Sequence, residues 1–267
     1  MTQDAKNEAL VLRSDAGGIA TLTLNRPDQF NTLSTPMMLE LQAHLAALAS
    51  DTTVRVIVLT GAGKAFCAGH DLNEMRADPS EAAMQAMFDL CTDNMMAITR
   101  LPQPVIARIN GVAAAAGCQL VAQCDLAIAV DTAKFGTSGI NVGLYCSTPS
   151  VPVTRNLGRK QAMELLMTGD MIPAAQACAW GLINRTVPAE KLDDAVQEMA
   201  AKIASKSPDA IALGKDLFYR QLEEGMAAAY ALAGKAITCN MQSDATRNAI
   251  DGFLGKQPLP DWPDRKN

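Results

Sequence analysis

The chain has 267 residues, 49% of them hydrophobic and 19% charged, and its net charge is −5. This length and composition indicate a globular protein with a sizeable core and exclude a disordered chain. Lysine and arginine are spread along the sequence instead of gathering into a basic patch, so we expect no nucleic-acid partner. The mildly acidic balance is common among metabolic enzymes.

Cysteine and histidine usage argues against a metal centre. The seven cysteines are scattered without a CxxC pair, and the two histidines, His44 and His70, lie far apart in the sequence. We therefore expect no metal site. Thiols in apolar surroundings are typical of a reducing compartment.

The N-terminal segment and the hydropathy pattern give an expectation for location. Residues 1–15 are polar, with acids early, and lack the apolar or Arg-rich pattern of a targeting segment. No apolar run approaches the roughly 20 residues needed to span a bilayer. We expect a cytoplasmic protein with no membrane partner.

The first elements are predicted to be a hairpin and a helix. Alternating apolar residues at 10–15 and 18–25 flank a glycine-containing turn, which favours two antiparallel strands. Helical spacing follows over 34–51, with Ser34 as a candidate N-cap and Pro36 in the first turn.

Strands and helices then alternate. Apolar runs at 54–61, 103–111 and 124–131 predict buried strands, and the segments at 79–100 and 117–124 predict helices between them. This alternation implies parallel strand pairing and an α/β architecture. From about Pro173 the pattern becomes mostly helical.

Two turns rich in small residues follow predicted strands. They lie within "VIVLTGAGKAFCAGHDL" and "PVIARINGVAAAAGCQLVAQC". Small residues allow backbone N–H groups to approach a ligand, and a following helix adds its positive dipole end. Facing each other, two such turns can hold a carbonyl oxygen as it becomes an oxyanion. Ordinary strand–helix joints share this pattern, so the turns alone leave both readings open. Neither turn has the glycine spacing of a dinucleotide or phosphate loop.

Several motifs in order resemble the crotonase, or enoyl-CoA hydratase/isomerase, family from about residue 10 to about 256. They include "LTLNRPDQFNTLS", the two turns above, "LMTGDMIPAAQACAWGLINRTVP" and "AIDGFLGKQP". The resemblance implies an α/β fold with a crotonase-like spiral of ββα repeats over 1–205. It also implies a helical trimerisation region over 206–267, and hence a homotrimer or homohexamer.

The resemblance further implies an acyl-CoA substrate and no cofactor beyond the coenzyme A that the substrate carries. The nominal reaction is hydration of a 2-enoyl-CoA in fatty acid metabolism. The oxyanion-hole donors fall on the backbone N–H groups of His70 and Ala116. The positions that match coenzyme A contacts are Gln29, Phe30, Ala68, His70, Asp71, Leu72, Ala116, Gly117, Phe253 and Lys256, the last two reaching a neighbouring subunit's ligand.

The chain departs from the family where the acid and base are placed. The two hydratase glutamates fall on Gln119 and Gly139, and an acid of a related dienoyl-CoA isomerase falls on Ser147. Gln119 can orient a water but cannot take its proton, and Gly139 can do neither. Because each acid–base group contributes roughly 10²–10⁴ in rate, hydration should be very slow.

Substitutes for the missing pair can be sought among nearby residues. The imidazole of His70 suits proton transfer, although packing or coenzyme A contact explains it equally. Asp71 fits a helix N-cap. A nucleophilic Cys146 would need a base, and Tyr145 and Ser147 are further candidates. Isomerisation, hydrolysis or decarboxylation of a thioester therefore stays open beside hydration. So does non-catalytic acyl-CoA binding, whereas intact turns disfavour a mere oligomeric scaffold.

Overall fold

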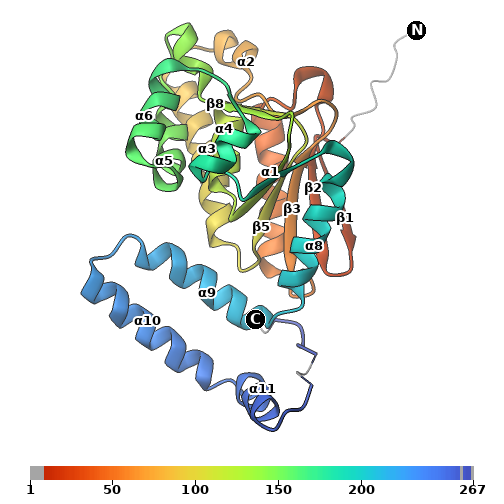
Figure 1. Ribbon diagram of the computed structural model, residues 1–267. Helices are drawn as coiled ribbons and strands as arrows, with labels where there is room; N and C mark the ends of the chain where they lie inside the picture. The colour runs from red at the N-terminus through yellow and green to blue at the C-terminus, as the bar shows by residue number, and fades with distance from the viewer. Residues whose placement is uncertain (1–8, 259–260, 266–267) are drawn as a thin grey trace.

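The structure is a computed structural model that describes residues 9–258 and 261–265 (Figure 1). Its strands form two sheets, one in the order β1-β2-β3-β5-β7-β10 and one in the order β4-β6-β8-β9. The strands are β1 (Val11–Ala16), β2 (Ile19–Leu24), β3 (Val56–Gly61), β4 (Ala65–Cys67), β5 (Val105–Ile109), β6 (Val112–Ala114), β7 (Leu126–Val130), β8 (Lys134–Gly136), β9 (Ile172–Pro173) and β10 (Arg185–Val187).

The predicted hairpin and first helix are both present. β1 and β2 pair antiparallel, and their turn has Gly17 and Gly18 at φ of 58° and 76°, a conformation that favours glycine. Helix α1 (Thr35–Ser50) begins after Ser34, whose hydroxyl accepts a hydrogen bond from the Met37 N–H at 3.4 Å. The side chain of His44 on this helix contacts the Val11 carbonyl, so it is a packing residue.

From β3 onward the chain repeats one unit. Each strand of the large sheet (β3, β5, β7) is followed by a strand of the small sheet (β4, β6, β8) and then by helix. Neighbouring strands of the large sheet from β2 to β10 pair parallel. The helices of these units are α2 (Leu72–Ala77), α3 (Glu81–Arg100), α4 (Ala116–Gln123), α5 (Ser147–Asn156) and α6 (Arg159–Thr168). This arrangement confirms the predicted α/β spiral of ββα repeats.

The C-terminal part is helical, as the sequence predicts. Its helices are α7 (Ala174–Trp180), α8 (Leu192–Ala204), α9 (Pro208–Gln221), α10 (Met226–Met241) and α11 (Asp244–Leu254). Figure 1 shows α10 and α11, in blue, standing away from the sheets. Apolar side chains such as Met226, Tyr230 and Phe253 are 72–79% exposed there. Trimerisation through this region stays a prediction.

Helix α9 is tied to the sheet by a buried ion pair. The Lys215 ammonium donates to the Asp125 carboxylate at 2.6 Å and to the carbonyls of Ile98 and Gln103, and the Tyr219 hydroxyl donates to the same carboxylate. Asp125, just before β7, also accepts from the Val105 N–H, so its carboxylate has a structural role. Across the described ranges, no helix is both long and apolar enough to cross a membrane.

Candidate active site

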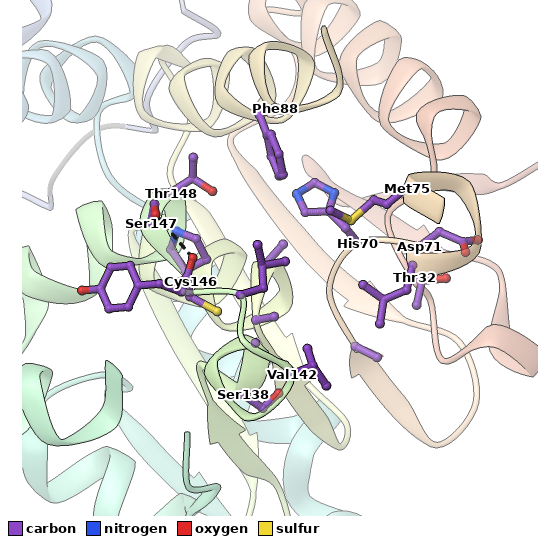
Figure 2. Close-up of a pocket in the computed structure, with 18 of the residues that line it drawn as sticks. Thr32, His70, Asp71, Met75, Phe88, Ser138, Val142, Cys146, Ser147 and Thr148 are labelled. Atoms are coloured by element: carbon purple, nitrogen blue, oxygen red, sulfur yellow. Dashed lines mark hydrogen bonds between the residues drawn. The ribbon is translucent and has the colours of Figure 1, made fainter. Parts of the chain in front are cut away.

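A cavity of about 680 Å³ opens between two turns that follow β4 and β6 and the segment that leads into α5 (Figure 2). One side is the donor wall, which we define as residues 68–72 and 115–117. The other is the loop wall, residues 138–149. Met75 of α2 and Phe88 of α3 add apolar surface between the two walls.

The first turn of the donor wall leaves one N–H without a protein acceptor. Leu33 donates its N–H to the Gly69 carbonyl at 2.8 Å and accepts from the Asp71 N–H at 3.3 Å. In such a parallel bridge the residue between the two, His70, turns its own N–H to the opposite side. Among the described residues nothing accepts from the His70 N–H.

The second turn leaves another N–H without an acceptor. Ala115 donates to the Gly136 carbonyl at 2.8 Å and has a φ of 48°, which is strained for a residue with a side chain. Ala116 is the first residue of α4, where backbone N–H groups lack intrahelical partners and the helix dipole is positive. Within residues 9–258 and 261–265 the Ala116 N–H also has no acceptor.

Glycine brings the two turns into contact. A Cβ on Gly69 would lie 2.9 Å from the Ala115 Cβ and 3.4 Å from the Ala116 nitrogen. A Cβ on Gly117 would lie 2.0 Å from the Cys67 carbonyl oxygen, so Gly117 allows α4 to pack against β4. The unpaired N–H groups of His70 and Ala116 therefore belong to two adjoining turns, the arrangement that stabilises an oxyanion.

Asp71 is already engaged in structure. Its carboxylate caps α2 by accepting from the Asn73 N–H at 3.0 Å, and it accepts from the Arg26 guanidinium at 3.0 Å. Burial disfavours the charged carboxylate, but the hydrogen bonds from Arg26 and Asn73 outweigh it, so the pKa of Asp71 lies below its ordinary value. The predicted helix cap is confirmed. An ionised, paired carboxylate cannot serve as a general acid near neutral pH.

The side chain of His70 lies in the cavity wall, edge-on to Phe88 with ring centroids 5.4 Å apart. Both ring nitrogens are buried and have no hydrogen-bond partner among the described residues. Burial lowers the pKa of the imidazole, and the nearby Leu33 carbonyl and the charge of Glu74 oppose this only in part. The ring is therefore neutral at pH 7. Leaving buried polar groups unpaired costs about 1–3 kcal/mol each.

The loop wall has no carboxylate where the family resemblance places one. A Cβ on Gly139 would lie 2.5 Å from the Leu144 carbonyl oxygen and 3.0 Å from the Cys146 sulfur, so the following loop occupies the space next to this residue. Burial raises the pKa of Cys146, which keeps the thiol neutral. The Ser147 hydroxyl donates to the Tyr145 carbonyl at 3.3 Å. Of all described residues lining the cavity, Asp71 is the single carboxylate.

Gln119 does not line the cavity. It lies one turn after the start of α4, is only 3% exposed, and its buried Oε1 has no partner among the described residues. Its amide follows the donor turn but is enclosed in the protein.

The structure gathers most, but not all, of the predicted site residues. Those that line the cavity are Gln29, Ala68, His70, Asp71, Leu72, Ala116 and Gly139. Those that do not are Phe30, Gly117, Gln119, Phe253 and Lys256. Sequence reasoning missed Met75, Phe88 and Val142 as cavity residues, because helical or loop periodicity does not indicate which gap a side chain borders. In the described part of the chain no three His, Cys, Asp or Glu residues gather as metal ligands would.

Comparison with known proteins explains this cavity. The family model of enoyl-CoA hydratase/isomerase matches residues 14–265. The chain belongs to the enoyl-CoA hydratase/isomerase family. A crystal structure of an enoyl-CoA hydratase from Mycobacterium smegmatis is similar, with 50% identity, a TM-score of 0.94, and 95% of this chain and 99% of that chain covered.

Members of one subgroup within the family are also similar. The human enoyl-CoA hydratase domain-containing protein 3 has a crystal structure with 39% identity and a TM-score of 0.91, covering 94% of this chain and 99% of that chain. The Xenopus laevis protein of this name is 40% identical over 92% of this chain and 83% of its own length. The stretches "GHDL" and "SGINVGLYCSTPSVPV" suggest the same subgroup.

The expected cytoplasmic location is wrong on this comparison. The relatives from Xenopus laevis, Rattus norvegicus and Homo sapiens are all named as mitochondrial, which points away from the cytoplasm. The physical reason is that buried thiols indicate a reducing environment without distinguishing one reducing compartment from another.

Proposed function

We propose that the cavity binds an acyl-CoA thioester whose carbonyl oxygen accepts hydrogen bonds from the N–H groups of His70 and Ala116. The observation that carries this proposal is the pair of unpaired N–H groups on adjoining turns, beside a largely apolar cavity. Two such donors stabilise the enolate or oxyanion that forms when a thioester reacts. Coenzyme A is part of the substrate, and the proposal needs no other cofactor.

The family supports the nominal reaction, hydration of a 2-enoyl-CoA in fatty acid metabolism. Gln29, Ala68, Asp71 and Leu72 border the cavity and suit contacts along the coenzyme A chain. Phe30 and Gly117 lie outside the cavity lining.

The last two predicted coenzyme A contacts, Phe253 and Lys256, favour an oligomer. Phe253 and Lys256 do not line the cavity of their own chain, so their proposed role requires the ligand of a neighbouring subunit in a homotrimer or homohexamer. The exposed apolar side chains of α10 and α11 favour such an assembly.

The loop wall favours a second candidate beside hydration. Neither Gln119 nor Gly139 can move a proton, and Asp71 is held by Arg26. A thioester reaction that proceeds through an enolate without two carboxylates, or acyl-CoA binding without turnover, fits this wall better than hydration does.

The first experiment measures thermal stabilisation of the protein by octanoyl-CoA. At 100 times Kd a ligand specific for the native state stabilises it by about 2.7 kcal/mol, which raises Tm measurably. The control ligand is the thioether S-octyl-CoA, which has the same chain but no carbonyl. We expect octanoyl-CoA to stabilise more. Equal shifts would remove the oxyanion role, and no shift with either ligand would remove acyl-CoA binding.

The second experiment measures hydration of crotonyl-CoA. We expect very slow turnover by the wild-type protein. Rapid hydration would show that the missing carboxylates have been replaced and would restore the nominal reaction.

A further inference from the structure

His70 is the residue of the cavity wall with an unexplained polar side chain. Six described residues have buried side-chain polar atoms without a partner, namely His70, Asn94, Gln103, Gln119, Thr186 and Arg265. Of these, His70 lines the cavity, and both of its ring nitrogens are unpaired. Buried polar groups are nearly always paired, and an exception in a cavity points to a ligand or a catalytic role.

Packing does not account for an imidazole at this position. The ring meets Phe88 edge-on, a contact that a phenylalanine would make equally well without burying two polar atoms. The oxyanion donor of this residue is its backbone N–H group, which every residue type except proline has. What a histidine adds at this position, compared with phenylalanine, is therefore its two ring nitrogens.

Other proton acceptors of the cavity are less suited to the task. Asp71 is bound to Arg26, and Ser147 donates to a backbone carbonyl. The thiol of Cys146 is held neutral by burial. The neutral ring of His70, in contrast, keeps a lone pair that no described group uses.

We propose that the imidazole of His70 is the catalytic base for a 1,3-proton shift in an enoyl-CoA thioester. The inference rests on the proposed function, since the thioester must first bind. The C–H bond at Cα breaks, the proton goes to the free ring nitrogen, and the electron pair forms a dienolate. The N–H groups of His70 and Ala116 hold the dienolate oxygen. The imidazolium then returns the proton to Cγ, and the double bond moves from Cβ–Cγ to Cα–Cβ.

This reaction needs one base and no water, which matches the composition of the loop wall. Hydration requires an activated water and two proton-transfer groups, whereas a single group can both remove and return a proton. The reaction requires no oxidant, metal or co-reactant.

Access to the ring involves Met75. Figure 2 shows the imidazole lying between Phe88 and Met75, and the ring nitrogens are closed to solvent. Met75 extends from α2, whose six residues are all at least partly exposed, and an unbranched thioether side chain moves easily between rotamers. A change in the Met75 rotamer would open the ring nitrogens to the cavity and to its water.

The charged groups around the ring set the expected pH dependence. Glu74 of α2 favours the protonated ring, whereas the neighbouring Asp71 and Arg26 neutralise each other. The phenyl ring of Phe88 packs against the imidazole from α3 and carries no charge. Because the base acts when neutral, the rate should fall as pH decreases through a pKa below the ordinary histidine value of 6.5.

The experiment compares wild-type protein with His70→Phe and with a matched control, His44→Gln. His44 lies on α1, contacts the Val11 carbonyl and does not line the cavity. Three quantities are measured for each protein: stabilisation by octanoyl-CoA, exchange of the α-hydrogens of octanoyl-CoA in heavy water, and isomerisation of 3-octenoyl-CoA. Octanoyl-CoA cannot isomerise, so its exchange reports on proton removal alone.

We expect His70→Phe to lower exchange and isomerisation by roughly 10²–10⁴-fold, the usual contribution of a general base. Its Kd for octanoyl-CoA should change less than threefold, and the Tm of the free protein should stay equal or rise. His44→Gln should leave the exchange rate unchanged, and the acid limb of the wild-type pH profile should vanish in His70→Phe.

Several results would overturn the inference. Equal exchange rates in wild type and His70→Phe would show that another group removes the proton. Binding without any exchange by the wild type would show a binding site without this base. A failure of octanoyl-CoA to stabilise the wild type would instead contradict the proposed function, and the base assignment with it.

Discussion

The two walls of the cavity differ in what fixes them. The donor wall is built from backbone groups on two turns that touch, and glycine at Gly69 and Gly117 makes that contact possible. The loop wall consists of a five-residue 3-10 turn over Ser138–Val142, a short loop and the first residues of α5, and it presents hydroxyls and a neutral thiol. Carbonyl polarisation is thus built into the fold, whereas proton transfer depends on a few exchangeable side chains. A chain of this fold can therefore keep carbonyl polarisation while its proton-transfer groups change.

The largest expected effect comes from separating the two turns of the donor wall. In Gly69→Ala the new methyl group would lie 2.9 Å from the Ala115 Cβ, at a φ of 104° that disfavours a side chain. Overpacking and strain together should lower the free energy of unfolding by about 2–3 kcal/mol and abolish the preference for octanoyl-CoA over S-octyl-CoA. Chemical denaturation and thermal shift measure the two effects.

Gly143→Ala is the matched control for this substitution. Gly143 also has a positive φ, 80°, but a Cβ there would meet nothing within 4 Å. It should lose about 1 kcal/mol from backbone strain and keep its ligand preference. If both variants lost the preference equally, contact between the turns would not be what positions the donors.

Placing glutamates at the two hydratase positions should have the next largest effect. In the double variant Gln119→Glu, Gly139→Glu, the Cβ at position 139 would lie 2.5 Å from the Leu144 carbonyl oxygen, so the loop must move. We expect a loss of roughly 1–3 kcal/mol and little gain in crotonyl-CoA hydration. Gly139→Ala, which adds the same Cβ without a carboxylate, should lose a similar amount of stability. A rapid hydratase from the double variant would show that the loop adapts freely.

The sequence predicted features that local chemistry determines. The hairpin, the cap of α1, the buried strands of the large sheet and the cap of α2 by Asp71 all follow from turn, capping and periodicity signals. The residue pattern itself did not indicate the small sheet, which only the family resemblance implied, because β4, β6 and β8 have three residues each and β9 has two, too short for a periodic pattern. These strands form because segments far apart in the sequence pair with each other, and a short stretch of sequence contains no signal for such pairing.

The cavity shows the same limit. Resemblance placed His70, Ala116 and Gly139 at one site, and the structure brings all three to the cavity wall. It also placed Gln119 there, but that side chain, on α4, is buried and does not line the cavity. The Arg26 partner of Asp71, 45 residues away in sequence, and the contact of Phe88 with His70 depend on tertiary packing.

A smaller effect should follow from changing Asp71 on the donor wall. Asp71→Ala removes the α2 cap and the Arg26 hydrogen bond, which should cost about 1 kcal/mol in unfolding free energy, since the pair is partly solvated. Asp71→Asn keeps the cap and removes the charge, so it should lose about half as much. Denaturant unfolding measures both variants. A loss in Asp71→Asn as large as in Asp71→Ala would show that the ion pair, and not the cap, holds this turn.

The smallest expected effect is a change in the pH dependence of stability. The pKa of His70 in the folded protein lies below 6.5, because burial disfavours the charged ring, whereas in the unfolded chain the ring titrates near 6.5. Below pH 6.5 the unfolded state therefore binds a proton that the native state does not, so the contribution of His70 to stability falls as pH decreases. Above pH 6.5 this contribution is constant. Replacing the ring by phenylalanine removes the proton-binding difference, and unfolding free energies measured between pH 5 and 8 should decline less toward acid in His70→Phe than in wild type. His44→Gln, outside the cavity, controls for loss of a histidine as such. An unchanged acid dependence in His70→Phe would mean that the pKa of the ring is the same in the folded and the unfolded protein, so that burial does not disfavour its charged form.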